Sequence, residues 1–118
     1  MSDCLFCKII AGEIPANVVL RDHGFVAFHD INPKAPVHIL VVPERHVVSI
    51  ADVGELSETE RAAMGPFIAR VAAAAGVESG GYRVATNAGP NARQEIMHLH
   101  WHVLGLSLIH ISEPTRPY

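Results

Sequence analysis

The most regular pattern of hydrophobic and polar residues lies in residues 97–104, which read MHLHWHVL. Histidine alternates there with large apolar residues, and strict alternation predicts a β-strand. Successive side chains of a strand point to opposite faces, so one face would carry only histidines. These are His98, His100 and His102. The other face would be apolar and pack on a core. The simplest alternative for the histidines is chance clustering or a solvated polar face.

Four other segments have the pattern of strands: residues 17–21, 24–29, 38–43 and 81–87. Asp22 and His23, between the first two segments, suit a tight hairpin. Residues 38–43 form an apolar run rich in β-branched residues, which predicts a central strand that is covered on both faces.

Two helices are predicted. Ser57 and Glu60 have the spacing of a capping box, and apolar residues at helical spacing follow, so a long helix should begin there and end before Gly76. Pro66 lies inside this segment and predicts a kink or a late start. Residues 4–11 predict a short helix. The sequence therefore predicts an α+β fold: an antiparallel sheet of about five strands, with the long helix covering one face.

Composition limits the classes of partner. The 118 residues carry a formal net charge of −3, which is not the electrostatic footprint of a nucleic-acid-binding protein. No apolar run reaches membrane-spanning length, and the N-terminus does not have the layout of a signal peptide. We therefore expect one cytoplasmic domain with no nucleic-acid or membrane partner. Cys4 and Cys7 should then be reduced.

Residues 106–118 continue the pattern poorly. They match the translation, in one reading frame, of a transposase adapter that is used in DNA sequencing libraries. We therefore expect a domain over residues 1–105 and a non-native tail over 106–118 that arises from adapter read-through. The alternative is a native amphipathic tail, and resequencing the source locus would decide between the two.

Several motifs share one order and spacing. His98 to Leu104 reads His-φ-His-φ-His-φ-φ, where φ is hydrophobic, and it follows CKIIAGEIP at 7–15, FHDINP at 28–33, APVH at 35–38 and GYR at 81–83. Over about residues 4–105 the chain resembles the histidine triad (HIT) family, in particular the bacterial type of its nucleotide-binding (Hint) branch. The resemblance implies a HIT-like fold and a homodimer whose two sheets join.

The resemblance also implies an activity. It is the hydrolysis of purine nucleoside 5′-phosphoramidates (conjugates of AMP or GMP) through a covalent nucleotidyl-histidine, with no cofactor required for catalysis. His100 would attack the α-phosphate, and His102 would hydrogen-bond a phosphate oxygen. His98 and His38 would orient or polarise the site. Neutral imidazole is a competent nucleophile near pH 7, so this chemistry suits the residues.

The same resemblance implies the substrate contacts. Asp30 would accept hydrogen bonds from the ribose hydroxyls, Ile31 would pack on the base, and Asn87 would contact the phosphate. The segment expected beside the phosphate is Arg93, Gln94 and Glu95, where one common family pattern has Gly-Gln-Ser/Thr. Considered singly, Asp30 and Asn87 would be turn residues, and His38 would be a satisfied core histidine.

A metal site is a separate prediction. Cys4 and Cys7 have the spacing of paired ligands, and structural zinc prefers four nitrogen or sulfur ligands. The resemblance to some bacterial family members adds His46 and His98 as the other two ligands. The alternative is a pair of reduced thiols packed near the N-terminal helix.

Three other functions compete with the favoured one. The first is a dinucleoside polyphosphate hydrolase, and the second is a nucleotide-binding module without useful turnover. The third is a metallohydrolase that holds zinc with all three histidines of the triad. Three alternate residues of one strand extend too far to share one tetrahedral ion with bonds of about 2 Å.

Overall fold

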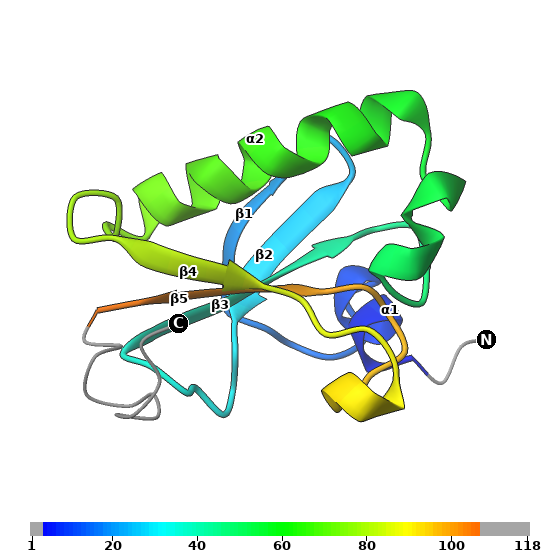
Figure 1. Cartoon of the computed structure of the whole chain (residues 1–118), viewed down its shortest axis with the longest axis horizontal. Helices are drawn as coiled ribbons and strands as arrows, with labels where there is room; N and C mark the ends of the chain where they lie inside the picture. The colour runs from blue at the N-terminus through cyan, green and yellow to red at the C-terminus, as the bar shows by residue number, and fades with distance from the viewer. Residues whose placement is uncertain (1–3, 107–118) are drawn as a thin grey trace.

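The computed structural model describes residues 4–106, and its centre is one antiparallel sheet of five strands (Figure 1). The strands lie in the order β1-β2-β3-β5-β4. Their bounds are β1 Val18–Asp22, β2 Phe25–His29, β3 Val37–Pro43, β4 Tyr82–Ala85 and β5 Trp101–Gly105. The predicted α+β fold with a five-stranded antiparallel sheet is confirmed.

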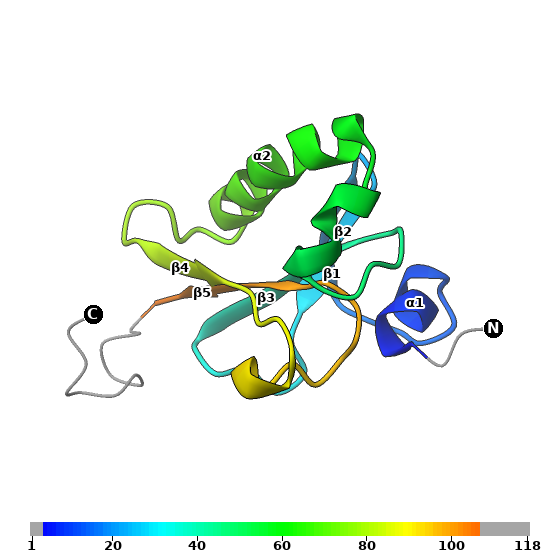
Figure 2. The same cartoon turned by 45° about the vertical axis from the view of Figure 1, so that its right-hand side comes forward.

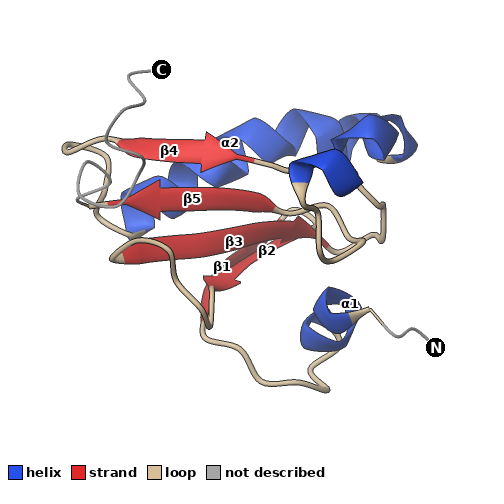
Figure 3. Cartoon of the chain, turned by 60° about the horizontal axis from the view of Figure 1, so that its bottom comes forward, coloured by secondary structure: helices blue, strands red, loops and turns tan. Residues whose placement is uncertain are grey.

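The two faces of the sheet are covered by different helices. The α-helices are α1 (Leu5–Ile10) and α2 (Glu58–Ala74), and the 3₁₀ helices are η1 (Ile50–Glu55) and η2 (Pro90–Ala92). Phe67 and Val71 of α2 pack in one core cluster with Phe25 of β2. Phe6 of α1 packs with Val26, the next residue of β2, in another cluster. Because neighbouring strand residues face opposite ways, α1 and α2 lie on opposite sides of the sheet (Figure 3).

The long helix begins where the capping box predicts. The Ser57 side chain accepts from Glu60 N, and the Glu60 side chain accepts from Ser57 N, so α2 starts at Glu58. The helix continues through Pro66, and a late start at this proline is wrong. It ends in a Schellman motif: Gly76 has a φ of 76°, and Val77 N donates to Ala72 O at 3.2 Å.

Some local predictions differ from the structure. The turn between β1 and β2 consists of His23 and Gly24, which have φ angles of 51° and 86°, whereas Asp22 still pairs with Phe25. Two positive φ angles match the twist of a two-residue hairpin. The last strand begins only at Trp101, so the predicted strand over residues 97–104 starts too early. The 3₁₀ helices η1 and η2 were not predicted.

Gly105 packs directly against Val77, the last residue of the Schellman motif. A Cβ on Gly105 would overlap Val77 Cγ1 and lie 2.9 Å from Val77 Cβ. We expect Gly105→Ala to lower the free energy of unfolding by about 1–3 kcal/mol, the usual cost of overpacking a core, measured by urea denaturation.

Two variants make this prediction specific. Adding Val77→Ala should restore part of the lost stability, because it removes the overlapping methyl groups. Gly65 lies on the exposed side of α2, where an added Cβ would meet no atom within 4 Å. Gly65→Ala should therefore stabilise the protein by roughly 0.8 kcal/mol, the difference in helix propensity. A Gly105→Ala protein as stable as wild type would contradict the packing described here.

No helix within residues 4–106 is long and apolar enough to cross a membrane. The expected non-native tail lies outside the described residues, except for Leu106, which is exposed.

Candidate functional site

A cleft of about 1130 Å³ opens on the sheet face opposite α2. One wall contains α1 and the segment 14–17, and a second contains the connection that follows β2. The third wall is the connection between β4 and β5, which carries η2 and lies on the α1 side of the sheet (Figure 2). Four histidines line the cleft: His29, His38, His100 and His102.

His38 and His102 form a neutral hydrogen-bonded pair. Lys34 N donates to His38 Nδ1 at 2.9 Å, so the proton of neutral His38 lies on Nε2. His38 Nε2 is 2.9 Å from His102 Nδ1 and 3.4 Å from Asp30 Oδ2. His102 Nδ1 therefore accepts from His38, and the proton of His102 lies on Nε2. Burial lowers the pKa of His38, and burial together with the nearby His100 and His38 lowers the pKa of His102 to about 4.

His100 has the opposite tautomer. Its Nδ1 lies 2.8 Å from the carbonyl oxygen of His98, which can only accept, so Nδ1 carries the proton. In the neutral ring, the lone pair is then on Nε2 of His100. The edge of Phe6 packs against the His100 ring with centroids 5.1 Å apart, and Thr86 Oγ1 donates to His100 O at 2.6 Å. The result is an oriented imidazole with a lone pair on the nitrogen farther from the backbone.

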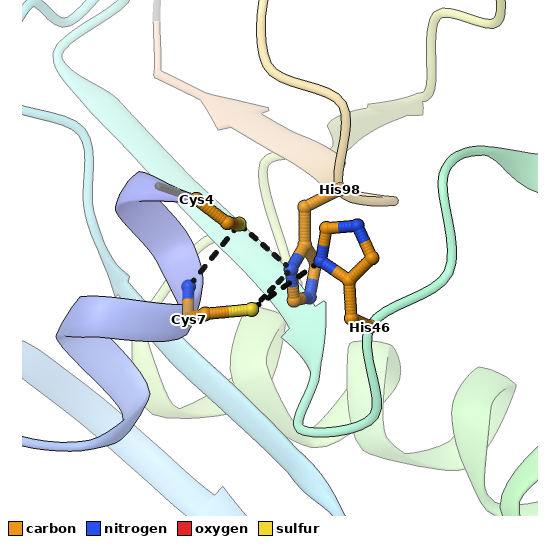
Figure 4. A group of neighbouring side chains, drawn as sticks. All are labelled: Cys4, Cys7, His46 and His98. Atoms are coloured by element: carbon orange, nitrogen blue, oxygen red, sulfur yellow. Dashed lines mark hydrogen bonds between the residues drawn. The ribbon is translucent and has the colours of Figure 1, made fainter. Parts of the chain in front are cut away.

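A cysteine–histidine cluster lies beside the cleft (Figure 4). Cys4 Sγ is 3.3 Å from His98 Nδ1, and Cys7 Sγ is 3.3 Å from His46 Nδ1 and 3.5 Å from His98 Nδ1. His98 Nε2 donates to Pro43 O at 2.8 Å. In the neutral ring, Nδ1 of His98 therefore carries the lone pair, which faces the sulfur atoms. Burial lowers the pKa of His98 and favours this neutral form.

The donor set of this cluster fits zinc. Its four ligand atoms, two sulfur and two nitrogen, all lie within 4.8 Å of one another. Bonds of about 2.3 Å to sulfur and 2.0 Å to nitrogen reach such atoms from one tetrahedral centre. The structure thus brings together the four residues that were predicted as ligands: Cys4, Cys7, His46 and His98.

Comparison with known proteins identifies the family. The family model of the HIT domain matches residues 11–107. This chain belongs to the HIT family. An uncharacterized HIT-like protein of Helicobacter pylori is 46% identical over 100 residues, which cover 85% of this chain and 93% of that protein.

Two further relatives of this HIT protein extend the comparison. The purine nucleoside phosphoramidase of Escherichia coli K12 is 37% identical over 103 residues and covers 87% of each chain. The solved structure of a histidine triad protein from Clostridium difficile has a TM-score of 0.85 at 39% identity, over 96% of this chain and 98% of that chain.

Most of the predicted substrate contacts of this HIT protein line the cleft. They are Asp30, Ile31, Asn87, Arg93 and Glu95. Ile31 is 91% exposed, more than any other large apolar side chain of the described residues, and it lies at the cleft. Asp30 Oδ1 accepts from Asn32 N at 2.8 Å, which fixes the carboxylate in its turn.

Gln94 is placed differently from the other predicted contacts. It is 7% exposed, and its side chain makes three hydrogen bonds to backbone groups. Gly89 N donates to Oε1 at 2.9 Å, and Nε2 donates to Val48 O at 2.6 Å and Ile96 O at 3.0 Å. In this HIT protein the Gln94 side chain therefore holds the connection between β4 and β5 in shape.

Sequence reasoning missed two residues that position His100. Thr86 contributes its hydroxyl, and Phe6 contributes the edge of its ring. The sequence did not distinguish Thr86 as a functional residue, because threonine is common in strands. Phe6 lies in the short N-terminal helix, and only its packing beneath the histidines distinguishes it from other core residues.

The neutral histidine pair predicts a pH dependence of stability. The pKa of His102 falls from 6.5 to about 4 on folding, so the unfolded chain binds more protons between these values. The free energy of unfolding should therefore decrease as the pH falls from 6.5 to 4, with a slope of up to about 1.4 kcal/mol per pH unit for this group. Urea denaturation at a series of pH values measures the slope. His102→Gln should reduce it, and equal slopes for the two proteins would contradict the prediction.

Proposed function

We propose that this HIT protein is a hydrolase that cleaves purine nucleoside 5′-phosphoramidates through a nucleotidyl-His100 intermediate. The observation that carries the proposal is the tautomer of His100. The His98 carbonyl holds the proton on Nδ1, and an unprotonated Nε2 remains in a cleft of nucleotide size. A neutral, oriented imidazole nitrogen is a suitable nucleophile for phosphorus.

The first step forms a bond from His100 Nε2 to the α-phosphorus. The bond from phosphorus to the leaving nitrogen breaks, and that nitrogen keeps the electron pair and takes a proton. His102, with its proton on Nε2, would donate to a non-bridging phosphate oxygen. His38 supports this donor because it holds Nδ1 of His102 as an acceptor at 2.9 Å. Such donors stabilise the charge that develops on the phosphate.

In the second step water attacks the phosphorus of nucleotidyl-His100. The water oxygen bonds to phosphorus and its proton passes to solvent, the bond from Nε2 to phosphorus breaks with its electron pair returning to Nε2, and AMP or GMP leaves. Dividing the reaction into two displacements lowers each barrier relative to direct attack by water. In these steps the residues of the chain supply the nucleophile and the donors, and no cofactor takes part.

The walls of the cleft suit a purine nucleotide. The exposed Ile31 offers an apolar surface to the base, and Asp30 offers carboxylate oxygens to the ribose hydroxyls. Asn87 lies in the connection after β4 and would contact the phosphate. The Escherichia coli relative is named a purine nucleoside phosphoramidase, which supports the same substrate class for this chain.

The cysteine–histidine cluster would hold a structural zinc ion. Cys4, Cys7, His46 and His98 would bind it and so connect α1 to the segment that carries His100. Binding of zinc here would stabilise the folded state, and the ion would not contact the substrate. We further propose that the protein is cytoplasmic and acts as a homodimer.

Intact-protein mass spectrometry tests the mechanism. The protein is mixed with adenosine 5′-phosphoramidate and quenched within milliseconds. We expect a transient mass increase of one AMP, which fragmentation locates on His100. Turnover without such an adduct in wild type would contradict the covalent mechanism. Binding of AMP with neither adduct nor turnover would support a nucleotide-binding module instead.

A further inference from the structure

Two connections face each other across the cleft, and each supplies charged side chains: Asp30 and Lys34 after β2, and Arg93 and Glu95 after β4. Asp30 and Ile31 follow β2, and the connection after β4 supplies Asn87, Arg93 and Glu95. In the sheet, β3 and β5 lie between β2 and β4, so the histidines of these strands lie between the two walls. A nucleoside at Ile31 with its phosphorus at His100 therefore directs its leaving group toward the wall after β4.

Arg93 has a backbone conformation that argues for a role of its side chain. Its φ is 63° and its ψ is 40°, the left-handed region in which glycine is unstrained and a side chain is disfavoured. The side chain is exposed and lines the cleft, and it forms no ion pair with any residue in the described range 4–106. An unpaired guanidinium at a strained position in a cleft is typical of a functional residue.

Glu95 places a carboxylate on the same wall. It is exposed, lines the cleft, and has no ion-pair partner within the described part of the chain. Between it and Arg93 lies Gln94, whose three hydrogen bonds fix the backbone of the connection. One positive and one negative group are therefore held two residues apart on this wall, and neither has an ion-pair partner among residues 4–106.

We propose that Arg93 and Glu95 form a subsite for an amino-acid leaving group. This inference rests on the proposed function, which places the phosphorus at His100. The carboxylate of the amino acid pairs with the Arg93 guanidinium, which suits planar carboxylates. When the bond from phosphorus to nitrogen breaks, the nitrogen takes a proton from solvent and leaves as an amine. The amine then takes a second proton, and Glu95 pairs with the ammonium ion. The Glu95 carboxylate would disfavour a phosphate leaving group relative to an ammonium ion.

Steady-state kinetics on three AMP phosphoramidates test this subsite. The leaving groups are alanine, alanine methylamide and ammonia, so that only the first has a carboxylate and the third has no substituent. Wild type should prefer the alanine conjugate over the methylamide about fivefold in kcat/KM, the size expected for a solvent-exposed ion pair. Arg93→Gly, whose glycine accepts the φ of 63°, should abolish this preference. It should lower kcat/KM for the alanine conjugate about fivefold more than kcat/KM for the unsubstituted phosphoramidate.

Glu95→Gln tests the negative half of the subsite. ADP serves as the probe with a phosphate leaving group, and the unsubstituted phosphoramidate is the reference. The variant should raise kcat/KM for ADP relative to the reference about fivefold, because it removes the repulsion. Arg21→Gln, a change in an exposed ion pair with Glu44 outside the cleft, is the matched surface control and should change neither ratio.

The outcomes separate the subsite from the proposed function. If wild type hydrolyses the alanine conjugate and the methylamide equally, or if Arg93→Gly keeps the preference, the subsite is overturned while the hydrolase stands. If no phosphoramidate is turned over, the proposed function fails and the subsite fails with it.

Discussion

Replacing His100 with alanine is expected to reduce kcat for adenosine 5′-phosphoramidate hydrolysis about 10⁴-fold or more and to abolish the AMP adduct. The expectation follows from the hydrogen bonds of the ring, because His100 Nδ1 donates to His98 O at 2.8 Å and leaves Nε2 as the nucleophile. Removing a nucleophile typically costs about this factor or more. Rapid-quench kinetics together with intact mass measure both effects.

The control is a histidine outside the cleft. His23 lies in the turn between β1 and β2 and pairs with Asp22 on the surface. His23→Asn keeps a residue that tolerates the positive φ, so activity should stay within twofold of wild type. A His100→Ala variant that retains a tenth of the wild-type kcat would mean that another group attacks the phosphorus.

Replacing Cys7 with serine is expected to remove bound zinc and lower the melting temperature by more than about 10 °C. Cys7 Sγ approaches both His46 and His98, so its loss removes the ligand that bridges the cluster. A zinc site loaded at about 1,000 times its Kd contributes roughly 4 kcal/mol, and each kcal/mol shifts the melting temperature by about 4–8 °C in a domain of nearly this size. Metal analysis and calorimetry measure the two quantities.

Cys7 is the better target because Cys4 Sγ also accepts a hydrogen bond at the start of α1. Lys8→Ser is the matched control, because it places serine in the same helix outside the cluster and should keep the zinc. Wild type treated with a chelator should have the same melting temperature as the Cys7→Ser protein. Equal melting temperatures for wild type and Cys7→Ser, with no zinc in either, would mean that the thiols only pack against the histidines.

The strands and the long helix could be predicted because their signals are local. Alternation within β2 separates Phe25 from Val26, and the structure places them in the two core clusters on opposite faces. The start of α2 was predictable because Ser57 and Glu60 satisfy each other's backbone groups without help from the rest of the fold.

The different surroundings of the three triad histidines depend on contacts far along the chain. His98 N bonds to Ile96 O, and Leu99 N bonds to Val47 O at 2.7 Å, so this segment leaves the ladder that Trp101 and the following residues form with β3. The ring of His98 consequently lies against Cys4 and Cys7, and the ring of His102 lies against His38. The alternation of histidine with apolar residues predicts that the three histidines share a face. It does not predict which residues each histidine ring contacts.

The position of the Gln94 side chain also could not be predicted from the sequence. Its three partners belong to the segment 89–96 and to Val48, which is distant along the chain. No periodicity or motif encodes such a side-chain anchor, and the resemblance suggested a contact with substrate at the same position. Only the fold shows that the two neighbours of Gln94 line the cleft while Gln94 itself does not.

The sheet separates a side that packs under α2 from a side that lines the cleft. Along β5, Val103 belongs to the core under α2, whereas its neighbours His102 and Leu104 line the cleft. Substitutions on the cleft walls, such as those at positions 93 and 95, leave the packing under α2 untouched. On the proposed function, a single substitution in the connection between β4 and β5 can therefore change the leaving-group preference without first requiring extra stability.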